Sequence, residues 1–123
     1  MKVKNIQLVN SIATLNKLLT CELNIKTQFN LDKNVKEIDK ILESYNASRK
    51  KLIEKYCDKD EEGKPKIINN QYTFKENLDE FNKEFNELNS IENDINIIKF
   101  SIDELEGVKV NSTELASINY MIK

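Results

Sequence analysis

The stretch LDKNVKEIDKILESYNASRKKLIEKY, from Leu31 to Tyr56, carries apolar residues at alternating steps of four and three positions. Because an α-helix has about 3.6 residues per turn, this spacing places them in one stripe along a helix. The stripe is apolar or aromatic at every position except Arg49, which is the only arginine of the chain. We therefore predict a long helix over about residues 25–57. The stripe consists of Leu31, Val35, Ile38, Leu42, Tyr45, Arg49, Leu52 and Tyr56.

A shorter helix is predicted before the long one, over about residues 5–20, where apolar side chains again follow helical spacing. The long helix then begins between Ile25 and Asn30, and both Asn24 and Asn30 are suitable N-cap residues. The sequence does not choose between these two caps. The buried face of the first helix is expected to contain Leu8, Ile12, Leu15 and Leu19, widened by Val9 and Leu18.

An acidic turn ends the long helix. The segment DKDEEGKP, residues 58–65, combines short acidic side chains with a glycine and a proline that are unfavourable inside a helix. We expect the turn to span residues 58–72, with Ile67 and Ile68 as a short extended piece or as the anchor of a loop.

The same stripe pattern returns after the turn and predicts a third helix over about residues 73–90. Thr73 with Glu76 three residues later forms a capping-box signature, which places the start of this helix at Thr73. The long helix and the third helix would thus form a helical hairpin. The second stripe consists of Phe74, Leu78, Phe81, Phe85 and Leu88.

The C-terminal segment, residues 91–123, has a different pattern. Apolar residues alternate between Ile95 and Ile102, which favours a short strand or an extended segment over the helices. Two further capping boxes predict one helical turn and then a terminal helix with Leu115, Ile118 and Met121 or Ile122 on its face. The boxes are Ser101 with Glu104 and Asn111 with Glu114.

These elements predict a mostly α-helical fold with a long central helix and two shorter antiparallel helical arms, followed by the extended segment and the terminal helix. With 123 residues, the chain is expected to form a single helical domain. At about 1.5 Å per residue the long helix is about twice as long as either arm, so part of its stripe needs further cover. The competing solution is a homodimer, because the repeat is also a coiled-coil signal.

Composition excludes several classes of function. The net charge of −2 and a pI of about 5.3 argue against nucleic-acid binding as a function of the whole domain. The chain contains no histidine, which removes the commonest general base, and we expect neither an enzyme nor a cofactor. No apolar run approaches the roughly 18–20 residues of a membrane span, and the first ten residues lack a secretory signal. A cytoplasmic protein is expected.

Metal binding is also not expected from the sequence. Cys21 and Cys57 are too few to form a zinc site and predict two reduced thiols that pack as small hydrophobes. The acidic residues of 58–63 match the first positions of an EF-hand loop, but position twelve is Asn69 where a glutamate is required. We interpret the segment as a polar turn between helices.

Arg49 is the most informative candidate for an interaction. Its aliphatic stem can pack along the stripe while the guanidinium reaches Glu84, Glu87 or water. Alternatively, it holds an anionic ligand or selects a partner. The candidate interaction residues are Arg49, Lys50, Tyr45 and Tyr56.

The order of the elements resembles small phage and prophage proteins of Gram-positive bacteria, and is similar to the DUF1617 group. The segments that carry this resemblance are NIQLVNSIATLNKLL, SRKKLIEKYCDKDEEGKPKI, FKENLDEFNKEFNEL and IKFSIDELEGVKVNSTELASINYMI. It implies a phage setting in the host cytoplasm and assigns no functional residue.

We therefore expect a noncatalytic protein-interaction factor of phage or prophage origin, which serves as an assembly or accessory protein and binds a phage or host protein. The alternative is a phage inhibitor of a host defence system that binds a protein or a small anionic ligand.

Overall fold

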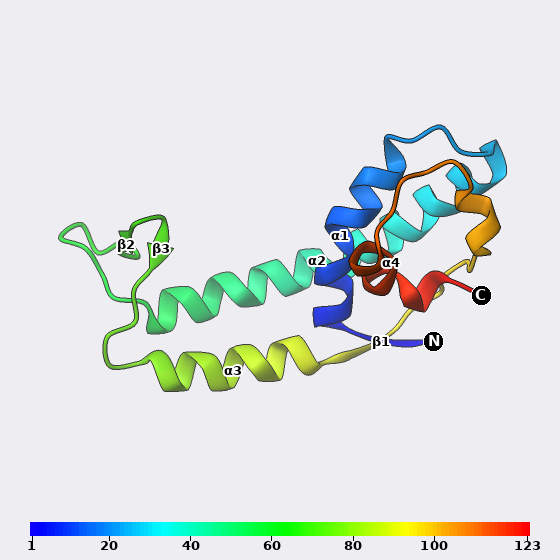
Figure 1. Cartoon of the computed structure of the whole chain (residues 1–123). Coiled ribbons are helices and arrows are strands. Elements are labelled where there is room, and N and C mark those ends of the chain that lie inside the picture. The colour runs from blue at the N-terminus through cyan, green and yellow to red at the C-terminus, as the bar shows by residue number, and fades with distance from the viewer. The chain divides into compact units, whose positions relative to one another are not determined.

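The computed structural model describes residues 1–123 and confirms a mostly helical fold with a long helix (Figure 1). Two 3₁₀ helices and four short strands complete it. The helices are α1 (Asn5–Leu19), α2 (Ile25–Tyr56), α3 (Leu78–Ser90), α4 (Ser112–Ser117), η1 (Ile102–Leu105) and η2 (Asn119–Met121). The strands are β1 (Lys2–Lys4), β2 (Ile67–Ile68), β3 (Gln71–Tyr72) and β4 (Glu92–Asp94).

The chain divides into two compact units. The terminal unit comprises Met1–Leu42 and Glu92–Lys123, and the central unit comprises Glu43–Ile91. Helix α2 contributes residues to both units, because the boundary falls between Leu42 and Glu43.

The stripe along α2 is buried in its first half. Leu31, Ile38, Leu42 and Tyr45 are buried, whereas Val35 is half-buried and Arg49 is exposed. A strict seven-residue repeat drifts by about 20° per repeat on a straight helix. In the second half the buried residues are accordingly Ile53 and Cys57, while Leu52 and Tyr56 are half-buried.

The N-terminal end of α2 is set by Asn24, one of the two caps that the sequence left open. Its Oδ1 accepts a hydrogen bond from the Lys26 N–H at 2.9 Å, and its carbonyl accepts one from the Gln28 N–H at 2.9 Å. These bonds satisfy donors of the first turn that have no partner within the helix.

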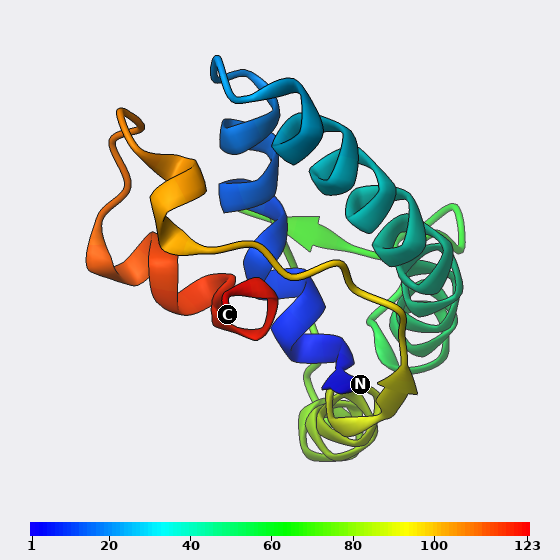
Figure 2. The same cartoon turned by 90° about the vertical axis from the view of Figure 1, so that its right-hand side faces the viewer.

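A buried asparagine of α2 fastens the extended segment that follows β4. Asn34 is only 1% exposed; its Nδ2 donates to the Ile98 carbonyl at 2.9 Å, and its Oδ1 accepts from the Ile98 N–H at 2.8 Å. Both backbone groups of Ile98 therefore find their partners on one side chain, as they would on a neighbouring strand. Figure 2 shows this segment running from β4 past α1 to η1. The predicted extended segment is thus present, but the strand β4 precedes it.

The N-terminus adds a strand that the sequence did not predict. Strand β1 pairs antiparallel with β4, and Val3 lies opposite Asn93. Val3 is 1% exposed, and the Asn93 side chain donates to the Val3 carbonyl at 3.1 Å. Three residues are too few for an alternating pattern to show in the sequence.

The buried face of α1 differs from the predicted one. Leu8, Leu15 and Leu18 are buried as expected, but Ile12 and Leu19 are only half-buried. The face is turned because it also buries two hydroxyl residues that have hydrogen-bond partners on the C-terminal helices. These residues are Ser11, at 0% exposure, and Thr14, at 4%.

In the central unit, α3 lies antiparallel beside the second half of α2 and forms the predicted hairpin (Figure 1). A small cluster of Ile53, Cys57 and Phe81 is buried between them, and Cys57 packs there as a small hydrophobe, as expected. The cluster is extended by the half-buried side chains of Leu52, Tyr56, Phe74 and Phe85.

The predicted start of α3 at Thr73 is wrong, since the helix begins at Leu78. The Thr73 N–H donates to the Lys66 carbonyl at 3.3 Å, and the Thr73 carbonyl accepts from the Asp58 N–H at 2.8 Å. The backbone is therefore extended and bonded to the acidic turn, and the Thr73 hydroxyl is buried without a hydrogen-bond partner. The capping box with Glu76 does not form.

A tight hairpin precedes this junction, and Ile67 and Ile68 form its first strand, which agrees with the short extended piece expected there. Strands β2 and β3 are joined by Asn69 and Asn70, whose φ angles are 53° and 63°. Two consecutive positive φ angles define a type I′ turn, which asparagine tolerates better than most residues.

The two capping boxes of the C-terminal segment are confirmed. The Ser101 N–H donates to Glu104 Oε2 at 2.7 Å at the start of η1, and the Glu114 N–H donates to Asn111 Oδ1 at 2.8 Å at the start of α4. The predicted terminal face is also buried at Ile118 and Met121, each with 0% exposure.

Replacing Asn34 by alanine should lower the free energy of unfolding by about 1–3 kcal/mol, because two part-buried backbone groups of Ile98 lose their partners. Chemical denaturation measures the loss, and hydrogen exchange of the Ile98 amide locates it. The matched control is Asn46→Ala, an exposed asparagine of the same helix, which should change stability by less than about 0.5 kcal/mol. Equal effects of the two substitutions would show that the Asn34 bonds are unimportant.

Candidate functional site

Two of the four residues nominated from the sequence are part of the packing of the central unit. Tyr45 is 6% exposed, and its hydroxyl donates to Asn89 Oδ1 at 2.6 Å. Burial raises the pKa of the Tyr45 phenol, and the positive charge of Arg49 acts in the opposite direction. Tyr56 is half-buried against the aromatic cluster. The Tyr45 hydroxyl thus has its hydrogen-bond partner within the central unit.

The other two nominated residues, Arg49 and Lys50, are exposed on α2. The expected pairing of Arg49 with Glu84 is not formed, because Glu84 Oε1 lies 3.8 Å from the Lys55 ammonium. The pKa of Lys55 is raised, mainly through its hydrogen bond with Tyr56 and then through the charge of Glu84. Arg49 belongs to none of the ion pairs in the structure.

An open groove of about 450 Å³ lies within the central unit, and Arg49 contributes to its lining. Three elements build it: the second half of α2, the N-terminal half of α3 and the β2–β3 hairpin with the residues that follow it. The lining includes Arg49 and Ile53 from α2, Tyr72 and Phe74 from the hairpin region, and Phe81 and Phe85 from α3. We call this hollow the central groove.

Stacked phenylalanines form the apolar part of the central groove. The ring centroids of Phe74 and Phe81 are 4.2 Å apart, and those of Phe81 and Phe85 are 5.4 Å apart. Two further lining residues are largely open to solvent, Tyr72 at 40% and Leu78 at 47% exposure. Apolar surface therefore continues from the cluster into the open groove.

Electrostatically, the central groove is simple. Arg49 is the only charged residue among those that line it, and the polar remainder consists of Asn70, Gln71 and Asn82 with the Tyr72 phenol. An unpaired guanidinium beside an apolar surface can donate two parallel hydrogen bonds to a carboxylate. The groove can thus bind apolar groups and one anionic group together.

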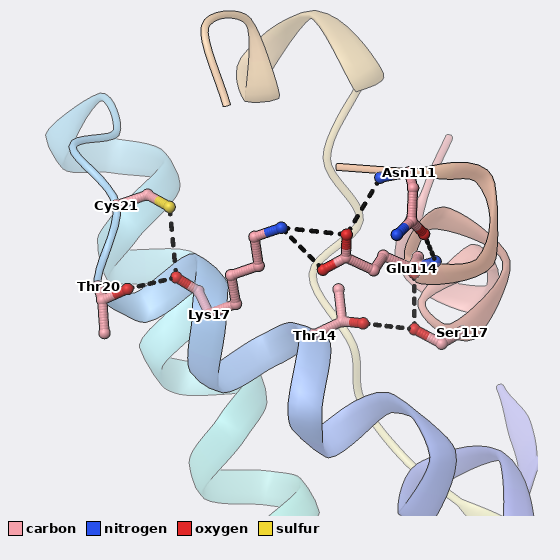
Figure 3. Close-up of polar contacts among 7 residues, drawn as sticks. All are labelled: Thr14, Lys17, Thr20, Cys21, Asn111, Glu114 and Ser117. Carbon is pink, nitrogen blue, oxygen red and sulfur yellow. Dashed lines mark hydrogen bonds and ion pairs between the residues drawn. The ribbon is translucent and has the colours of Figure 1, made fainter. Parts of the chain in front are cut away.

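A second constellation, in the terminal unit, joins α1 to the C-terminal helices through three pairs of polar side chains. The pairs recur every three residues on both partners, and Figure 3 shows two of them. We call this set the polar ladder. It consists of Ser11 with Tyr120 at 2.8 Å, Thr14 with Ser117 at 2.8 Å, and Lys17 with Glu114 at 2.9 Å.

The groups of the polar ladder are occupied by structural bonds. The hydrogen bond from Lys17 lowers the pKa of Glu114, and the same carboxylate accepts the Asn111 N–H at 3.1 Å. Burial raises the pKa of the Tyr120 phenol. The Cys21 thiol donates to the Lys17 carbonyl at 3.3 Å. The ladder therefore holds α4 on α1, and we do not interpret it as a reactive site.

An acidic hollow of about 440 Å³ lies where the connection before α2 meets η1. Its lining includes Glu22, Asp103, Glu104 and Glu106. The Glu104 carboxylate is fully engaged, because it accepts the Thr27 hydroxyl at 2.9 Å and the Ser101 N–H. No three Cys, Asp or Glu side chains of the chain are grouped to hold a metal ion.

The acidic turn of residues 58–65 is likewise organised by its own backbone. Asp60 Oδ1 accepts the N–H groups of Glu62 and Lys64, each at 2.9 Å, and the Asp58 carboxylate accepts that of Lys75 at 3.2 Å. These carboxylates shape the turn and connect it to the segment before α3.

Comparison with known proteins adds no relative: the chain matches no protein-family model, and no curated protein or solved structure is significantly similar to it. None of the helices combines the length and the hydropathy that a membrane span requires.

The sequence pointed to Arg49 but not to the groove around it. Tyr72 and Leu78 were missed, because Tyr72 lies in a two-residue strand and Leu78 was assigned to a buried stripe. The sequence signal closest to the groove was the recurrence of Phe74, Phe81 and Phe85, which line it.

The structure predicts an acid-sensitive bond at Glu104. Its pKa is lowered, mainly by the hydrogen bond from the Ser101 backbone and then by that from Thr27. A carboxyl whose folded pKa lies below its unfolded value of about 4.3 stabilises the fold above that value and loses this contribution as pH falls. Wild type should therefore be more stable than Glu104→Gln at neutral pH, and the difference should close between about pH 5 and 3.

Thermal unfolding at a series of pH values measures this difference. The control is Glu106→Gln, an exposed glutamate of the same turn, which should follow wild type at every pH. A difference between wild type and Glu104→Gln that stays constant down to about pH 3 would contradict the assignment.

Proposed function

We propose that the protein is a noncatalytic protein-interaction factor that binds a partner protein in the central groove. In this proposal it serves as a cytoplasmic assembly or accessory protein of a phage or prophage. The observation that supports it best is an open groove, lined by stacked phenylalanines and flanked by exposed apolar side chains, within a unit of only Glu43–Ile91.

The exposed apolar side chains around the groove support a protein partner. Besides Tyr72 and Leu78, the hairpin exposes Ile67 at 58% and Ile68 at 48%. Contiguous apolar surface on a small protein is typical of interaction sites, and aromatic residues with arginine are enriched among the residues that dominate binding energy. The terminal unit also exposes apolar residues, among them Ile25 and Phe29, but Tyr72 and Leu78 are the exposed ones that line a groove together with stacked aromatic rings.

The titrating groups support a noncatalytic role. Strongly perturbed carboxyl, phenol or amine groups often mark active sites. Here the shifted groups have structural partners: Glu104 and Glu114 complete capping boxes, Tyr45 bonds to Asn89, and Tyr120 bonds to Ser11. Their perturbations are explained without a reaction.

The phage setting in this proposal comes from the sequence resemblance alone. The alternative function, inhibition of a host defence system, would use the same groove, since Arg49 can hold an anionic group of a protein or of a small ligand. The identity of the bound partner separates the two: a structural phage protein supports assembly, and a host nuclease or other defence component supports inhibition.

Leu78→Asp should weaken partner binding at least about tenfold while leaving the fold intact. Leu78 is exposed and opens α3, where an aspartate is favourable because of the helix dipole. Quantitative affinity capture from infected or lysogenic cells should show a partner retained by wild type and reduced at least about tenfold by Leu78→Asp.

The control for this experiment is Ile102→Asp, which changes an equally exposed apolar residue of the terminal unit, at 55% exposure. It should retain the partner. Identical sets of captured proteins for wild type and both variants would refute the central groove as the binding site.

A further inference from the structure

We infer that the segment bound in the central groove is an amphipathic helix that carries a carboxylate opposite Arg49. This inference rests on the proposed function and specifies the chemistry of the partner.

The shape of the groove favours a helix. Its long walls are two antiparallel helices, with Arg49 and Ile53 on one side and Leu78, Phe81 and Phe85 on the other. A third helix can pack into the groove between two others by inserting side chains at i, i+3 or i+4, and i+7. An extended peptide has less to bind, because β2 and β3 have only two residues each and offer few backbone partners.

The length of the groove sets the number of contacts. From Leu78 to Phe85 the helix advances by seven residues, which is about 10 Å. Two helical turns of a partner span this distance, and the β2–β3 hairpin stands beside the Leu78 end (Figure 1). We therefore expect two apolar anchors on consecutive turns, packed on the phenylalanine stack.

The positive charge of Arg49 determines the third expected contact, which is with an acidic side chain of the partner. Arg49 lies at the end of the groove away from the hairpin, since it is the lining residue of α2 that is most distant in sequence from the turn. Lys50 and Lys51 follow it on the exposed side of α2. No carboxylate lines the groove, so the guanidinium is available to an acid of the partner.

A second copy of the chain fits this pattern less well. If the central groove packed on its own copy, its lining would bring apolar and amide groups but no carboxylate to Arg49. A desolvated guanidinium without a partner is costly. We therefore assign the groove to a different protein that supplies the acid.

A peptide library tests this assignment on the intact chain. The probe is a displayed library of helical peptides of about 15 residues, long enough to be helical, with an Ala, Gln and Lys background and randomised positions along one face. Wild type should enrich Leu, Ile, Met or Phe at i and i+4, and Asp or Glu about one turn further on. Arg49→Gln should retain the apolar anchors and lose the preference for the acid.

A double-mutant cycle then measures the contact. Changing the selected acid to its amide should weaken binding to wild type about tenfold and have little effect on binding to Arg49→Gln. The matched control is Lys50→Gln, which removes the same charge from the neighbouring exposed position outside the groove lining and should behave as wild type.

The outcomes distinguish a failure of this inference from a failure of the central groove as a binding site. Apolar anchors selected without an acid, or an acid preference that survives in Arg49→Gln, would overturn this inference and leave the central groove as a binding site. Selection that is unchanged by Leu78→Asp would refute the groove itself. A dimer in sedimentation experiments that Leu78→Asp dissociates would assign the groove to a second copy and also overturn the inference.

Discussion

The pair of hydrogen bonds between the Asn34 side chain and the Ile98 backbone is the constraint on which the terminal unit depends. The segment after β4 has no neighbouring strand at Ile98, and its part-buried peptide groups would cost about 1–3 kcal/mol if they were left without partners. Asn34 supplies both partners from the middle of a helix. The chain is thereby held between β4, which pairs with β1, and Phe100, which forms a bridge with Ile122.

The central unit is stabilised differently. Its core is a small aromatic and aliphatic cluster, and Asp58 connects the turn to it by bonding to Lys66 and Thr73 through its backbone and to Lys75 through its carboxylate. Two antiparallel helices and a short hairpin bury Phe81 and leave Phe74 and Phe85 half-buried. These three rings line the central groove, so the proposed binding site follows from the small size of the unit.

Features that depend on local sequence could be predicted, whereas those that depend on distant partners could not. The stripe of α2 and the capping boxes of Glu104 and Glu114 involve residues three or four positions apart. The box at Thr73 has the same local signature, but backbone hydrogen bonds to Lys66 and Asp58 form in its place.

The roles of Asn34, Ser11 and Thr14 were missed, because a polar residue in a helix is ordinarily exposed and only its distant partner explains its burial. Similarly, Arg49 was chosen for its rarity, while the groove around it depends on the position of the hairpin.

The polar ladder between α1 and the C-terminal helices also limits how these elements can slide. Its three pairs are chemically different: two hydroxyls, a hydroxyl with a phenol, and an ion pair. If the C-terminal helices moved by one step of three residues, Lys17 would face a serine and Glu114 would lose its cation. Apolar contacts alone tolerate such slippage, whereas this sequence of donors and acceptors has a single alignment in which every group is satisfied. The polar ladder therefore fixes the position of α4 and η2 along α1.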